Sequence, residues 1–170
     1  MPGAQILVDI AVESLPNADK DRDDPMYATG NLDFLVDDTL VRVGQFEGAL
    51  LLLPTLEILA SGISRMRRGD LTVEVAVVGD STPFWIVTQK RVPERAFIVH
   101  REMKTPIVDK TDLDRECEGA VGTFLAFMRD NNALRPDLPH IRSMLMNVTL
   151  SWPALCSFLA PGTTYPKRRR

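Results

Sequence analysis

The sequence is poor in the residues that build metal sites and disulfide frameworks. Among its 170 residues are two cysteines and two histidines, and 6% of the chain is aromatic. The cysteine and histidine positions lack the spacing of zinc ligands, and two cysteines are too few for the framework of a small secreted domain. We therefore expect Cys117 and Cys156 to be buried free thiols, with no metal and no cofactor bound.

No apolar run is long enough to span a bilayer. Pro54 and Glu57 interrupt the apolar residues between 50 and 60, and Asp9 interrupts those between 5 and 12. No basic segment precedes the latter, as a secretory signal would require. The sequence therefore predicts a cytoplasmic protein with no membrane partner.

Motifs that mark strong cases of catalysis or ion binding are also missing. Phosphate-binding loops, dinucleotide glycine patterns, nucleophile elbows and zinc-protease helices are absent. The aspartates between 19 and 24 evoke a calcium loop, but Asp24 stands where an EF-hand needs glycine, and Gly30 where it needs glutamate. A solvated acidic loop explains them better, and an outward strand face with a turn explains the aspartates between 33 and 38.

What the chain does have is the composition of an ordinary globular domain, with 45% hydrophobic and 25% charged residues. Its net charge of −3 divides into −8 for residues 1–60 and +5 for residues 61–170. The acidic residues 19–24, within the loop 16–30, and the basic tail 167–170 create most of this contrast, although a dipolar surface that steers a charged partner is the alternative. Four basic residues on an otherwise acidic domain argue against nucleic acid as a partner.

The most informative segment is 71–101, where three runs of alternating apolar residues are separated by short turn signals. A period of two with short breaks predicts a three-stranded antiparallel meander. Within it, the alternation leads us to expect that Val73, Val75, Ile86 and Val99 are largely buried.

Further strands and helices are expected on both sides of the meander. The strands are expected at residues 5–15, 32–36 and 40–43, the last two as a hairpin or as one bent strand. The helices are expected at 46–66, at 111–131 and in a shorter segment capped by Asp137. Because Pro54 lacks an amide proton and crowds the preceding turn, it predicts a kink or two abutting helices in the first of them.

This order predicts an α+β fold. An antiparallel sheet of five to six strands, including the 71–101 meander, is covered on one face by the long kinked helix and the C-terminal helices. Residues 1–150 form a single domain, and 151–170 add an apolar segment and the basic tail. The layout resembles that of small bacterial binding proteins, including immunity proteins that block a toxin, and the resemblance is one of layout alone.

The end of the third meander strand holds the candidate chemistry. His100 and Glu102 share a face of an extended strand, and a carboxylate can orient an imidazole as a general base, although a surface pair of these residues is commoner. Basic residues gather around the second turn of the meander. Arg91, Arg95 and Arg101 are therefore candidates for binding an acidic or anionic partner, with a solvated sheet end as the alternative.

The apolar segment near the C-terminus is the other candidate. Trp152, Leu155 and Phe158 either fold back on the core or dock on a partner or a second copy. We expect this segment to pack against the long helix or against a second subunit of a homodimer.

Two functional hypotheses follow. The first is a non-catalytic protein-interaction module, such as a bacterial immunity-type or small assembly protein. The second is a small enzyme or ligand-binding domain with its site near His100 and Glu102. A deep polar pocket beside His100 would favour the second hypothesis, and a flat charged or apolar surface would favour the first.

Overall fold

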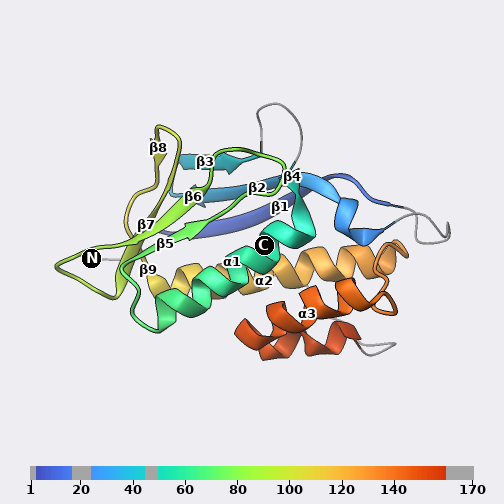
Figure 1. Ribbon diagram of the computed structural model, residues 1–170. Helices are drawn as coiled ribbons and strands as arrows, with labels where there is room; N and C mark the ends of the chain where they lie inside the picture. Colours follow the sequence, from blue (N-terminus) through green and yellow to red (C-terminus); the bar gives the residue numbers. More distant parts are fainter. Residues whose placement is uncertain (1–2, 17–23, 45–49, 160–170) are drawn as a thin grey trace.

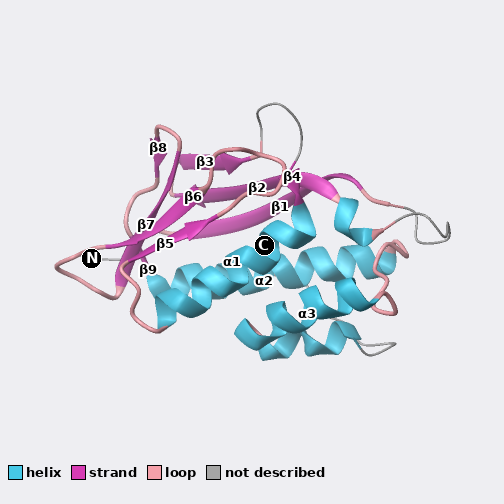
Figure 2. Ribbon diagram, in the orientation of Figure 1, coloured by secondary structure: helices cyan, strands magenta, loops and turns pink. Residues whose placement is uncertain are grey.

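The computed structural model describes residues 3–16, 24–44 and 50–159. Within these ranges the strands form two antiparallel sheets, one of four strands and one of five, and the helices gather on one side of them (Figures 1 and 2). The prediction of an α+β fold with antiparallel pairing is confirmed. The strands divide between two sheets, where the sequence had predicted one.

The first sheet, sheet A, is built around its second strand. Its strands are β1 (Ile6–Ser14), β2 (Thr29–Val36), β3 (Thr39–Val43) and β4 (Leu50–Leu51). β2 pairs with β1 along one edge and with β3 and β4 along the other. The chain reverses between β2 and β3 at Asp37, whose φ is 50°, so of the two alternatives the hairpin is the correct one.

The second sheet, sheet B, contains the predicted meander. Its strands are β5 (Thr72–Val75), β6 (Phe84–Thr88), β7 (Arg95–His100), β8 (Met103–Lys104) and β9 (Val108–Asp109). Val73, Val75 and Ile86 are buried, as expected. Val99 is half-buried, because Ile98 pairs with Ile86 on the inward side and Val99 lies on the other side of the strand.

The inward faces of the two sheets meet in the core, where the ring centroids of Phe34 and Phe84 lie 5.3 Å apart. Two long helices, α1 (Leu52–Arg67) and α2 (Lys110–Asp130), pack against β5 and β1 respectively. A third helix, α3 (Pro139–Ser151), packs on α1 on the side away from the sheets (Figure 1). The result is a layer of sheets, a layer of two helices and an outer helical layer.

Helix α1 begins later than the sequence predicted. Residues 46–49 lie outside the described residues, Leu50 and Leu51 form β4, and the helix runs unbroken from Leu52. Pro54 therefore stands in the first turn, where an amide proton has no partner within the helix. The prediction of two abutting helices is wrong for this reason. In the first turn, Pro54 removes no hydrogen bond of the helix, so it does not force a kink in the helix interior.

Helix α2 confirms the predicted segment 111–131 to within a residue at each end. The start of α3 differs from its prediction, because the capping position is Leu138 and not Asp137. The Asp137 carboxylate instead pairs with Arg135, with 3.0 Å between Oδ2 and Nη2. A competing ion pair thus takes the side chain that the sequence assigned to the helix end.

The segment after α3 turns back onto the helices. A 3₁₀ helix, η2 (Pro153–Leu159), contacts α3 and α2. Trp152, Leu155 and Phe158 are all buried. Residues 160–170, including the basic tail 167–170, lie outside the described part of the chain, as do residues 17–23 of the acidic loop.

Candidate protein-docking surface

His100 lies on the inward side of sheet B, with 3% of its surface exposed. Its Nδ1 is 3.2 Å from the carbonyl oxygen of Pro83. Strand β7 ends at His100, and the chain reverses at Arg101, whose φ is 54°. Glu102 lies in this exposed turn, so the two candidate catalytic residues do not continue one strand face.

The carboxylate beside this strand end is Asp80, which the sequence did not single out. Nη2 of Arg101 lies 3.1 and 3.2 Å from its two oxygens, and the amide of Thr82 donates to Oδ1 at 3.0 Å. Burial, the largest influence, raises the pKa of Asp80, but these hydrogen bonds and the charge of Arg101 outweigh it and leave the pKa below its usual value. These hydrogen bonds fix the loop between β5 and β6. The imidazole of His100 beside them is buried and not accessible to a substrate.

The three candidate residues of the apolar C-terminal segment are part of the buried core. The Trp152 indole N–H donates to Oδ1 of Asp114 at 2.8 Å, and Nη2 of Arg67 donates to the same oxygen at 2.6 Å. Nη1 of Arg67 also donates to the Ser151 carbonyl at 2.7 Å. This cluster ties α1, α2 and the end of α3 together, so Trp152 presents no surface to a partner.

The two cysteines are free and lie in different surroundings. Cys117 is buried on α2, as expected, whereas Cys156 is exposed on η2. The prediction that Cys156 is buried is wrong, because η2 turns Leu155 and Phe158 inward and this side chain outward.

The outer face of sheet B is the side turned away from the helices (Figure 1). Its centre is a block of four half-buried apolar residues, Trp85 and Val87 on β6 and Phe97 and Val99 on β7. Trp85 stands opposite Val99, and Val87 opposite Phe97. The solvent face of an antiparallel sheet is normally polar, so an aromatic and aliphatic block there is unusual.

Charged residues border this block. Nζ of Lys104 lies 4.2 Å from the centroid of the Phe97 ring, and Glu74 stands opposite Trp85. Arg95 begins β7 on the same side as Phe97, with its Nε 3.4 Å from Oδ1 of Asp109. The structure thus brings one of the predicted binding arginines to the edge of the block.

The other two predicted arginines lie at opposite ends of the same sheet. Arg91 is exposed in the turn between β6 and β7, and Arg101 lies beyond the far end of β7, paired with Asp80. All three predicted arginines therefore lie on or beside sheet B. The sequence did not reveal the apolar block itself, because Trp85 and Val99 read equally well as core residues.

The chain has no match among protein-family models, curated proteins or solved structures. In the described ranges, no group of three or more histidine, cysteine or acidic side chains is placed to hold a metal ion. No helix of the same ranges is long and apolar enough to cross a membrane. Function is therefore inferred from the surfaces of this chain alone, and the outer face of sheet B is the most distinctive of them.

Proposed function

We propose that this chain is a non-catalytic protein-interaction module, of the immunity or small-assembly type, that docks its partner on the outer face of sheet B. The observation that carries the proposal is the block of Trp85, Val87, Phe97 and Val99 on the solvent side of a sheet. Protein interfaces characteristically have an apolar, aromatic centre and a charged rim, and tryptophan and arginine dominate their binding energy.

The charges around the block indicate an acidic partner. Arg91 and Arg95 lie where β7 begins, Lys104 lies on β8 beside the other end of β7, and all three are exposed. A complementary negative surface would speed association and fix the orientation of docking.

Catalysis near His100 and Glu102 is supported less well. A general base must reach the proton that it removes, and His100 is almost fully buried beside a backbone carbonyl. Glu102 is exposed in the following turn. A surface hollow lies on α3, which is on the other side of α1 and α2 from sheet B (Figure 1).

Photocrosslinking in the native host tests the proposal. A photoreactive amino acid at Val87, on the outer face of sheet B, should yield one discrete protein adduct. The matched control is Leu40, an exposed apolar residue on sheet A, where no such adduct is expected. The substitution Trp85→Ser, or the exposed charge reversal Lys104→Glu, should weaken the adduct without changing the melting temperature by more than a few degrees.

Three outcomes would overturn the proposal. They are no adduct from Val87, equal adducts from Val87 and Leu40, or an adduct that survives both substitutions. Because Lys104 is exposed, its variant separates a lost contact from a lost fold if Trp85→Ser proves unstable.

A further inference from the structure

The solvent face of α3 carries a second unusual apolar feature. Leu150 is 81% exposed and Met146, one turn earlier, is 54% exposed. A single exposed leucine is common, but two large apolar side chains four residues apart lie on the same side of a helix. From Ser143 to Ser151 this helix carries no charged residue, in a chain that is 25% charged.

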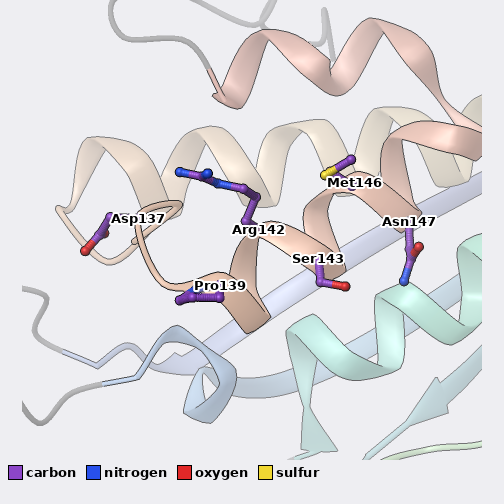
Figure 3. Close-up of a pocket in the computed structure, with 6 residues that line it drawn as sticks. All are labelled: Asp137, Pro139, Arg142, Ser143, Met146 and Asn147. Carbon is purple, nitrogen blue, oxygen red and sulfur yellow. The ribbon is translucent and has the colours of Figure 1, made fainter.

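A hollow opens on the same helix, towards its N-terminal end (Figure 3). Its volume is about 290 Å³, which falls just below the usual range for small-molecule pockets, about 300 to 1,000 Å³. The lining residues are Asp137, Pro139, Arg142, Ser143, Met146 and Asn147. A hollow of this size on the surface of a helix suits one or two aliphatic side chains better than a cofactor.

The distance along α3 between the hollow and the exposed Leu150 suits contact between two antiparallel copies of the helix. Ser143, in the middle of the lining, and Leu150 are seven residues apart, as are Pro139 and Met146. Seven residues make about two helical turns, so each pair lies on one side of the helix, with its members roughly 10 Å apart along the axis. A twofold axis midway, near Met146, would carry each Leu150 into the hollow of a second copy.

We propose that two copies of this chain associate through α3, antiparallel about that axis, with Leu150 of each seated in the hollow of the other. On α3 itself, the uncharged stretch places no like charges opposite each other at the centre, and the nearby carboxylate of Glu57 on α1 accepts a hydrogen bond from the Asn147 amide at 2.6 Å. At the edge, Asp137 pairs with Arg135 at 3.0 Å, and Nε of Arg142 donates to the Pro136 carbonyl at 3.1 Å. The aliphatic stem of Arg142 is left to cover the incoming leucine.

The arrangement differs from the homodimer expected from the sequence, in which residues 152–158 formed the contact. Those residues are buried within the chain, and the neighbouring face of α3 takes over the role. One helix face buries less than the roughly 800 Å² per partner of a typical stable interface, so the dimer is expected to be weak. Because α3 and sheet B lie on opposite sides of the α1 and α2 layer (Figure 1), both docking faces stay open in the dimer.

Analytical ultracentrifugation of the full chain tests the association. At about 100 µM, above the dissociation constant of a micromolar dimer, wild-type protein should sediment mainly as a dimer and Leu150→Glu as a monomer. The matched control is Leu71→Glu, because Leu71 is 59% exposed just before β5, and this variant should remain dimeric. A monomeric wild type, or a Leu150→Glu variant that still dimerises, would overturn the proposal.

A crosslink then tests the geometry. In a Cys156→Ser background, Met146→Cys lies near the twofold axis and should form a covalent dimer rapidly with a short bismaleimide. Leu71→Cys in the same background should not. Equal crosslinking of both variants, or none of Met146→Cys, would contradict the antiparallel arrangement. Since neither variant alters the outer face of sheet B, failure here is distinguishable from failure of the proposed function.

Discussion

Asp114 joins three segments that are distant in the sequence. Its carboxylate accepts hydrogen bonds from Arg67 of α1 and from the indole of Trp152, while Arg67 also reaches the carbonyl of Ser151. Hydrogen bonds to a charged group contribute more than neutral ones, and Trp152 adds a large buried surface. This carboxylate therefore holds the C-terminal segment on the helices.

Two substitutions at Trp152 separate these contributions. Trp152→Phe removes the hydrogen bond and should lower the free energy of unfolding by about 1–3 kcal/mol. Trp152→Ala also leaves a cavity and should lower it by about 3–5 kcal/mol. Urea denaturation measures both, with the exposed Leu150→Ala as the control near zero. Equal, small effects of the two substitutions would show that the segment is not anchored here.

Asp80 predicts a pH dependence. Its pKa is lowered in the folded protein, so between the folded value and the ordinary value of about 3.9 the unfolded state binds more protons. The stabilisation is therefore complete above the ordinary value and is lost as pH falls through the folded one. Wild-type stability should drop more steeply than that of Asp80→Asn between about pH 5 and pH 3. Parallel curves of unfolding free energy against pH would contradict this.

At the scale of elements, α1 lies very close to sheet B. A Cβ added at Gly62 would lie 2.8 Å from Cγ1 of Val73 on β5, a stiff β-branched side chain. Glycine in the middle of a helix costs about 1 kcal/mol in propensity, so its presence here reflects the close packing of helix on strand. The absence of a side chain at Gly62 thus allows α1 to approach β5 closely.

Gly62→Ala should therefore destabilise the protein although alanine is the better helix former. The overpacking cost of about 1–3 kcal/mol opposes a propensity gain of about 1 kcal/mol. Ser61→Ala, at an exposed position of the same helix, is the matched control and should be neutral or slightly stabilising. Thermal unfolding of the two variants measures the difference, and a higher melting temperature for Gly62→Ala would refute the close contact.

The same elements show what the sequence can predict. Alternation placed β1 and β5 correctly, because each of these strands has one clearly apolar side. It could not orient β7, where both Ile98 and Val99 are apolar and only the pairing with β6 decides which is buried. The docking surface was missed for the same reason, since an apolar outer face looks like a core strand. Asp80 was missed because its partner Arg101 lies 21 residues further along the chain.

At the scale of the whole molecule, sheet B and α3 lie on opposite sides of the α1 and α2 layer (Figure 1), and each carries one of the two apolar features. Basic side chains and Glu74 border the apolar block on sheet B, and the face of α3 is uncharged at its centre. The first suits an acidic partner and the second suits a copy of itself. A weak dimer would present two docking faces, and avidity would then strengthen binding to a dimeric or clustered partner.

The two cysteines report on the integrity of this fold. In native protein without reductant, a thiol reagent should label Cys156 quickly and leave the buried Cys117 unlabelled. After denaturation it should label both. Fast labelling of two thiols in the native state would show that α2 is not packed as described, and a total below two after denaturation would indicate a bond between them.

The most direct test of the docking claim is the affinity of the crosslinked partner, once purified, for matched variants. Trp85→Ser should raise the dissociation constant by at least about tenfold, as expected for an aromatic residue at the centre of an interface. Leu40→Ser, which removes one exposed apolar side chain from sheet A, should leave it unchanged within about twofold. Calorimetry on both, with melting temperatures recorded, gives the answer. An unchanged affinity for a folded Trp85→Ser protein would contradict the assignment of the outer face of sheet B as the docking surface.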